Sequence, residues 1–191
     1  MRVDVRPIPA GLTPLIRLAA LVALLFVLAS PAAAALASNS YDGNIYALYA
    51  GNGSLVPPRS SLAQSLAAER TAVIVYYLDD CADCKRFAPV VSELQRSWGN
   101  AIDLIPLVTD PLQPSQASDG ADPARYWHGQ VPQVVVIDPR GKVVFDADGQ
   151  VKLTAIQTAI SQATGLALPE GADNDGLSLS VNELNTEVVS R

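Results

Sequence analysis

The chain of 191 residues is long enough for one ordinary domain with extensions. Its formal net charge is −6, and its 13 lysines and arginines are scattered along the sequence. Nucleic acid is therefore not expected as a partner, because phosphate contacts need clustered basic side chains.

Residues 1–37 differ in composition from the rest of the chain and predict a signal peptide or an N-terminal membrane anchor. Arg2, Arg6 and Arg17 precede a strongly apolar stretch, and a region rich in small residues follows it. Cleavage and retention both stay open, because no charged residue lies between Arg17 and Asp42 and a membrane span needs about 20 mostly apolar residues. In either case the arginines stay in the cytoplasm and the rest of the chain crosses the membrane.

Residues 38–59 are predicted to form an N-terminal extension with a short strand and a loop. Ile45, Ala47 and Tyr49 alternate with other residues, as side chains on one face of a strand do. The adjacent prolines at 57 and 58 end this element.

Residues 60–164 carry alternating helix and strand signals and predict one domain. Ser61 and Gln64 have the spacing of a capping box at a helix start. The run at 71–78 is apolar on both faces, which is typical of a central, buried strand. The predicted order is a helix at 61–70, a strand at 71–78, a helix at 85–98, a strand at 102–108, a loop at 109–123, a hairpin of 131–137 and 142–147, and a helix at 153–163.

This order predicts an α/β fold with a central mixed β-sheet flanked by helices on both faces. Pro106 removes one donor from the strand at 102–108, which indicates an edge strand or a bulge. Residues 165–191 are predicted to be an acidic, flexible C-terminal tail.

The two cysteines of the chain, Cys81 and Cys84, lie where the buried strand ends and a helix begins. This position puts the first sulfur at a helix N-terminus, whose unpaired amides and dipole stabilise a thiolate. The second sulfur, one turn deeper, is near enough to close a disulfide. After export such a pair can persist as a disulfide, because the reducing cytoplasm no longer acts on it.

The motif CADCKRFAPVVSEL resembles the CxxCKxxAPxxxEL pattern of the thioredoxin superfamily, with Lys85 after the second cysteine and Pro89 inside the helix. Val131 and Pro132 match the hydrophobic residue and the cis-proline that face the cysteines in that family. The resemblance covers roughly residues 60–164 and implies a thioredoxin-like fold. It also implies that Cys81 is the nucleophile, that Cys84 is the resolving thiol, and that Pro132 shapes the groove for an extended substrate.

The sequence departs from that family in its acidic residues. Asp80 and Asp83 surround the first cysteine, where they oppose thiolate formation and favour a basic substrate. Val75 stands where the family has a buried carboxylate that accepts the proton during resolution, so general disulfide reduction is not expected. Trp127 and Val131 complete the predicted substrate groove, although ordinary packing is an alternative for Trp127.

The segment SYDGNIYALYAGNGSLVPPR, joined to an exported domain with DDCADCK, resembles the cyanobacterial family of thylakoid membrane photosystem I accumulation factors. This resemblance implies a membrane-associated protein of the thylakoid, with its soluble domain on the lumenal (or periplasmic) side. It also implies a protein client, either a photosystem I subunit or an assembly factor.

No cofactor and no metal are predicted. Cys81, Cys84 and His128 supply three ligands, whereas a closed structural zinc site wants four. A solvent-facing loop is the predicted environment of His128. Two functions stay open: an exported thiol-disulfide oxidoreductase, and a non-catalytic assembly factor of thioredoxin-like fold that binds a membrane-protein client and keeps its cysteines in a static disulfide.

Overall fold

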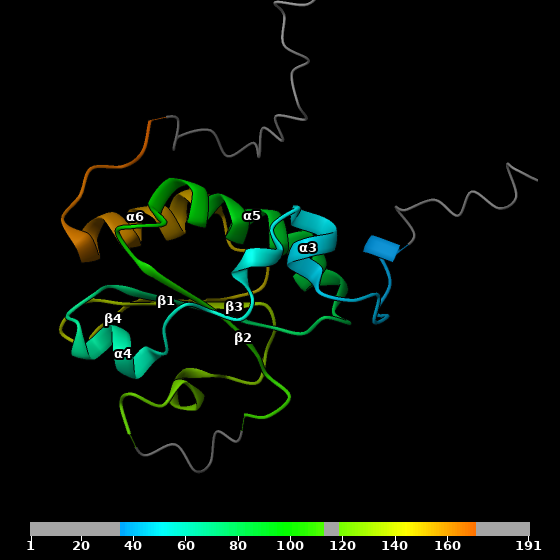
Figure 1. Ribbon diagram of the computed structural model, residues 1–191, viewed down its shortest axis with the longest axis horizontal. Helices are drawn as coiled ribbons and strands as arrows, with labels where there is room; N and C mark the ends of the chain where they lie inside the picture. Colours follow the sequence, from blue (N-terminus) through cyan, green and yellow to red (C-terminus); the bar gives the residue numbers. More distant parts are fainter. Residues whose placement is uncertain (1–34, 113–118, 171–191) are drawn as a thin grey trace, which may run out of the picture. The chain divides into compact units, whose positions relative to one another are not determined.

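The computed structural model describes residues 35–112 and 119–170 (Figure 1). The predicted export segment at 1–37 lies almost entirely outside these residues, and so does most of the predicted tail at 165–191. Within the described ranges, no helix has the length and apolar character that a membrane crossing requires.

A four-stranded mixed sheet forms the centre of the domain, with the strand order β2-β1-β3-β4. Its strands are β1 (Ala72–Tyr77), β2 (Asp103–Val108), β3 (Gln133–Ile137) and β4 (Val143–Asp148). β1 pairs with β2 in parallel and with β3 antiparallel, and β3 and β4 form the hairpin. Every residue of β1 is buried, because helices cover both faces of the sheet.

Helices lie on both sides of this sheet (Figure 1). One face carries α5 and α6, with α3 beside α5, and the other face carries α4. The helices are α3 (Ile45–Ala50), α4 (Leu62–Ala67), α5 (Ala82–Trp98) and α6 (Leu153–Thr164), with short 3-10 turns η1 (Gly53–Leu55) and η3 (Pro123–Tyr126).

The core has two parts, one on each face of the sheet. Val73, Val75 and Tyr77 of β1 point into the larger cluster, which includes the buried side chains of α5 and α6. Ile74 and Tyr76 point into the smaller cluster on the α4 side. The alternation along β1 therefore divides the core in two. Cys84 belongs to the larger cluster, and α4 and the loop before β3 contribute to the smaller one.

Most of the predicted elements are confirmed. The Ser61 side chain accepts a hydrogen bond from the Gln64 amide, and the Gln64 side chain accepts one from the Ser61 amide, which completes the capping box. Pro106 lies in β2, the edge strand next to β1. The mixed sheet with helices on both faces is the α/β fold that the element order predicts.

The predicted strand at 45–49 is wrong, because this segment forms helix α3. The Asn44 side chain accepts a hydrogen bond from the Ala47 amide and caps the helix, and Gly51 ends it in the left-handed conformation with φ of 60°. Ile45 and Tyr46 are both buried, although a strand would send neighbouring side chains to opposite faces. The segment thus packs against α5 as a helix, and its side chains do not alternate between two faces as those of a strand would.

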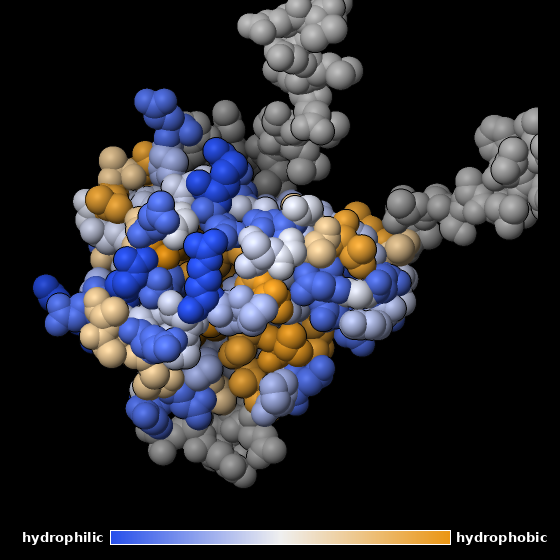
Figure 2. Space-filling view, viewed as in Figure 1, coloured by the Kyte–Doolittle hydropathy of each residue, from blue (hydrophilic) through white to orange (hydrophobic). Residues whose placement is uncertain are grey.

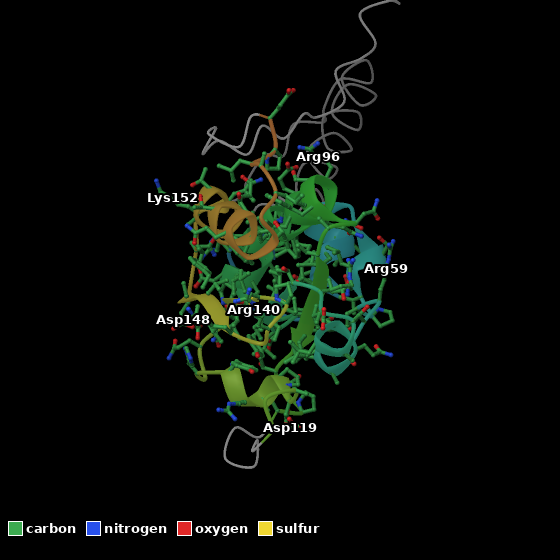
Figure 3. The ribbon with its side chains drawn as sticks, turned by 90° about the vertical axis from the view of Figure 1, so that its left-hand side faces the viewer. Arg59, Arg96, Asp119, Arg140, Asp148 and Lys152 are labelled. Carbon is green, nitrogen blue, oxygen red and sulfur yellow. The ribbon has the colours of Figure 1, made fainter. Side chains whose placement is uncertain are left out.

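Polar side chains cover most of one face of the domain. Figure 2 shows hydrophilic residues over most of the face seen in Figure 1, while its largest apolar area lies near the end of β2. Figure 3 labels six charged side chains that lie on several different elements and loops of the domain. They are Arg59, Arg96, Asp119, Arg140, Asp148 and Lys152.

Candidate thiol-exchange site

The two cysteines lie at the first turn of α5, directly after the connection from β1. Cys81 is the N-cap residue of this helix, and its Sγ accepts a hydrogen bond of 3.1 Å from the Cys84 amide. The Cys81 side chain is partly exposed, whereas Cys84 is 2% exposed. Both are free thiols in this structure. One sulfur is therefore accessible to a partner, and the other lies behind it.

Val131 and Pro132 lie across from the first cysteine. The Cys81 Sγ is 4.0 Å from the Val131 carbonyl oxygen, and the Val131–Pro132 peptide bond is cis, as the resemblance implies. Pro132 itself is buried. The loop before β3 therefore presents a backbone carbonyl to the accessible sulfur.

The environment of Cys84 keeps this residue protonated at neutral pH. Burial, and next the hydrogen bond with Cys81, raise the pKa of the Cys84 thiol well above its usual range. A backbone hydrogen bond from Leu78 offsets only part of this rise. The two thiols thus differ in access and environment, which is the division expected between a nucleophile and a resolving thiol.

The acidic residues of the motif have different surroundings. Asp80 is exposed. Asp83 is also exposed, and it forms an ion pair with Arg86 on the next turn of α5. Asp79 accepts a hydrogen bond of 3.0 Å from the Ile45 amide at the start of α3. Arg86 therefore balances part of the charge that the sequence places between the cysteines.

The described strand β1 carries no carboxylate, and Val75 stands at the position of the missing acid. Val75 is fully buried and packs in the same core cluster as Cys84. Tyr77 and Tyr46 belong to this cluster as well, and their rings meet edge to face with centroids 4.9 Å apart. Burial raises the pKa of both phenols, so they stay neutral. The buried Tyr77 hydroxyl has no hydrogen-bond partner among the described residues.

The remaining predicted residues, Trp127 and His128, lie in the loop before β3. Trp127 packs against the core cluster on the α4 side of the sheet, opposite the cluster that holds Cys84, which favours the packing interpretation. His128 is exposed, as predicted, but its Nε2 lies 3.1 Å from Oδ2 of Asp146 on β4. Within the described residues, no group of three His, Cys, Asp or Glu side chains is arranged to hold a metal.

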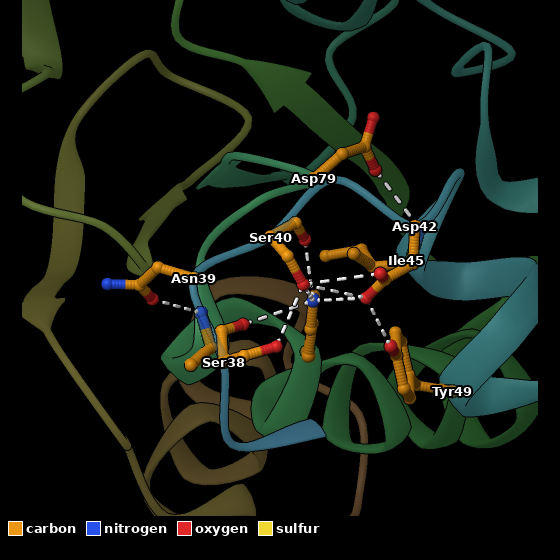
Figure 4. A network of polar contacts seen from close by, with 9 residues as sticks. Ser38, Asn39, Ser40, Asp42, Ile45, Tyr49 and Asp79 are labelled. Carbon is orange, nitrogen blue, oxygen red and sulfur yellow. Dashed lines mark hydrogen bonds and ion pairs between the residues drawn. The ribbon is translucent and has the colours of Figure 1, made fainter. Parts of the chain in front are cut away.

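The sequence did not predict that the N-terminal extension reaches the first turn of α5. Lys85 is fully buried, and its Nζ lies 2.5 Å from Oδ2 of Asp42 and 2.7 Å from the Ser40 carbonyl oxygen (Figure 4). The Asn39 Oδ1 accepts a hydrogen bond of 2.8 Å from the Ala82 amide, next to Cys81. The signal for this contact was a lysine within the apolar stripe of a helix, since buried charges need partners.

Charge and hydrogen bonding stabilise the ionised forms of this pair. The hydrogen bond with Lys85, and next the one from Tyr49, hold the pKa of Asp42 below its usual value. Burial disfavours the Lys85 ammonium, but the hydrogen bond and the charge of Asp42 outweigh burial and raise the pKa of Lys85. The pair is therefore ionised throughout the neutral range.

The parallel β1–β2 pair, the β3–β4 hairpin, the helices on both faces and the Cys-x-x-Cys at the start of α5 define a thioredoxin-like protein. Residues 59–161 match the family model of TraF, the F plasmid transfer operon protein, and the chain belongs to this thioredoxin-like family.

Known proteins similar to this chain include a thylakoid membrane protein. Thylakoid membrane protein slr1796 of Synechocystis sp. is 39% identical over 158 residues, which cover 83% of this chain and 78% of the relative. The exposed lipoprotein thioredoxin Etrx1 of Streptococcus pneumoniae aligns with 51% of this chain and 89% of its own, at 16% identity and a TM-score of 0.41. An HIV epitope scaffold aligns with 76% of this chain and 98% of its own, at 17% identity and a TM-score of 0.34.

Proposed function

We propose that this chain is an exported, membrane-associated thiol-disulfide exchange protein that supports photosystem I accumulation by acting on a protein client. The observation that carries the proposal is the arrangement of the thiols: Cys81 is partly exposed at the N-terminus of α5, and Cys84 is buried one turn behind it. A helix N-terminus stabilises a thiolate on the exposed sulfur.

The exchange needs no electron donor or acceptor beyond the two thiols and the client disulfide. The Cys81 thiolate attacks one client sulfur, so that a new S–S bond forms as the client S–S bond breaks and the released client thiolate takes up a proton. Cys84 then loses its proton and attacks the Cys81 sulfur, which closes the intramolecular disulfide and releases the second client thiol. The client gains two electrons and two protons, and the Cys81/Cys84 pair gives up the same number. The reverse reaction oxidises a client dithiol.

The surroundings of Cys84 make the second step slow. Its thiol is buried with a raised pKa, and Val75 occupies the position from which a carboxylate would accept the proton. This combination supports specialised exchange with one client rather than general disulfide reduction.

The thylakoid and the lumenal (or periplasmic) side of its membrane are part of the proposal. The relative of 39% identity is a thylakoid membrane protein, and an export signal at residues 1–37 would carry the domain across the membrane. The client is then a photosystem I subunit or an assembly factor exposed on that side.

A non-catalytic assembly factor is the second candidate. The observation that favours it is the missing proton acceptor at Val75, because a pair that resolves slowly can also stay closed as a static disulfide. In this case the domain binds its client through its surface, and the disulfide only stabilises the start of α5.

A trapping experiment in cells separates these functions. A Cys84→Ser variant cannot resolve the mixed disulfide, so exchange predicts client proteins that stay covalently bound through Cys81 until a reductant is added. The matched control carries Cys81→Ser as well and should trap nothing. An unaltered photosystem I level in cells with the double variant, together with no trapped partner, would contradict the exchange function and leave the structural one.

A further inference from the structure

The N-terminal extension reaches the thiol site through one side chain, that of Asn39. Its Oδ1 accepts a hydrogen bond of 2.8 Å from the amide of Ala82, the first residue of α5 after the N-cap Cys81 (Figure 4). Ala82 directly follows Cys81, and its N–H is one of those at the start of a helix that have no partner within the helix. The extension therefore provides the acceptor for the amide next to the first cysteine.

The position of Asn39 is fixed from both sides by a single ammonium group. The Nζ of Lys85 lies 3.1 Å from the carbonyl oxygen of Ser38 and 2.7 Å from that of Ser40, the two neighbours of Asn39. Lys85 lies on the same first turns of α5 as Ala82 and is fully buried. The backbone around Asn39 and the amide that it contacts are thus held by one helix.

Two of the N–H groups at this helix start have different acceptors. The Cys84 amide donates to the Cys81 sulfur at 3.1 Å, and the Ala82 amide donates to Asn39. An amide oxygen carries partial negative charge, and negative charge near a forming thiolate makes that thiolate less stable. The Cys84 amide therefore donates to the sulfur, while the Ala82 amide donates to an oxygen that carries partial negative charge.

We propose that Asn39 is a positioning residue that limits thiolate formation at Cys81 by occupying the Ala82 amide and placing its own amide oxygen beside the site. The residues after the predicted export segment would then be part of the thiol site, not a spacer before it. This inference deepens the proposed function and rests on it, because it concerns the reactivity of the same sulfur.

The test measures the rate of Cys81 alkylation by iodoacetamide across a range of pH, in the full chain with Cys84→Ser so that one thiol reacts. Asn39→Ala frees the Ala82 amide and should speed the reaction at neutral pH by about two- to fivefold. Asn39→Asp keeps an acceptor on that amide but adds a full negative charge, and it should slow the reaction by about as much. The pH profile should move in opposite directions in the two variants.

Asn52→Ala is the matched control, because Asn52 also joins the extension to α5, through hydrogen bonds of its Nδ2 to Ser92 and Gln95 further along the helix. It should loosen this contact and leave the alkylation rate of Cys81 unchanged. Equal rates in all variants, or shifts of the same sign in Asn39→Ala and Asn39→Asp, would overturn the role of Asn39. If Cys81 does not react even with Asn39 intact, the proposed thiol exchange itself fails.

Discussion

Lys85, one residue after the second cysteine, lies with its buried ammonium 2.5 Å from the carboxylate of Asp42 in the N-terminal extension. The Tyr49 hydroxyl donates a hydrogen bond of 2.8 Å to the same carboxylate, and the Lys85 Nζ lies 5.5 Å from the centre of the Tyr49 ring. A lysine beside the dithiol thus binds helix α3 and its approach segment to α5. The stability of the extension and the geometry of the thiol site are therefore linked.

Asp42→Asn should lower the stability of the domain to denaturant, because it leaves the buried Lys85 ammonium without its counter-charge. The comparison variant is Glu93→Gln, which removes the ion pair with Arg96 on α5, a pair whose cation is 74% exposed. Water solvates the Arg96 guanidinium when the pair is lost, and such a pair contributes at most about 1 kcal/mol, so Glu93→Gln should have the smaller effect. Equal midpoints for Asp42→Asn and the parent in chemical unfolding would contradict this role of the pair.

The same variant has a defined pH dependence. The pKa of Asp42 in the folded chain lies below the ordinary value of 3.8, so its contribution to stability is complete above that value. The contribution is lost as the pH falls through the lowered pKa. The difference in unfolding free energy between the parent and Asp42→Asn should therefore be constant near neutral pH and should shrink in strong acid, as measured by urea unfolding at several pH values. A difference that grows with acid is the contrary result.

Tyr46→Ala should destabilise the domain by about 3–5 kcal/mol, because the Tyr46 ring, which belongs to α3, is buried against the ring of Tyr77 on β1. Leu48→Ala, two residues further on, should change stability by less than about 0.5 kcal/mol, since the Leu48 side chain is 56% exposed. Thermal or urea unfolding of both variants measures the contrast. Similar losses from the two changes would contradict a helix docked through Ile45 and Tyr46.

The two thiols should differ sharply in reactivity in the folded, reduced chain. Cys81 is accessible, while Cys84 is 2% exposed and protonated at neutral pH because burial raises its pKa. Brief treatment with iodoacetamide should therefore modify Cys81 and leave Cys84 free until a denaturant is added, as peptide mass spectrometry can show. Modification of Cys84 at the same rate as Cys81 would contradict the burial of the second sulfur in the folded chain.

Val75→Asp should restore a carboxylate to the core cluster that contains Cys84. We expect a faster release of the mixed disulfide, because a buried acid can accept the Cys84 proton. We also expect a loss of at least about 2 kcal/mol of stability, since a polar group then replaces a fully buried valine. Val75→Asn is the control, because it adds polarity without a proton acceptor. If both variants resolve mixed disulfides at the parent rate, proton transfer does not limit this site.

Local sequence signals were sufficient for the sheet and for the long helices. A buried run of β-branched residues identified β1, and the capping box located the start of α4. Pro106 indicated an edge strand or a bulge, and β2 is the edge strand. Helix α3 was missed because residues at alternate positions in its six-residue sequence also fit one face of a strand. A run this short is compatible with either a helix or a strand. The helical form is stabilised because Ile45 and Tyr46 both pack into the core. The residues that they contact lie elsewhere in the sequence, so the segment alone does not reveal this packing.

The cysteines and the residues at 131 and 132 followed from a motif, and the structure brings Val131 to the Cys81 sulfur. The contacts of Asn39 and Asp42 did not follow, because their partners Ala82 and Lys85 are 43 positions away in the sequence. No periodicity or spacing rule connects residues at that separation. The signal in the sequence was the place of Lys85 in the apolar stripe of its helix, because a buried ammonium needs a partner.

The central claim is that Cys81 and Cys84 form a dithiol that cycles while the domain stays folded. Equilibrating the full chain with mixtures of reduced and oxidised dithiothreitol, and counting free thiols by mass after acid quenching, measures this directly. We predict one reversible two-electron transition in which the pair loses two hydrogens and closes a disulfide between Cys81 and Cys84. A disulfide that is reduced only after a denaturant has unfolded the domain would contradict the claim and would favour the static role.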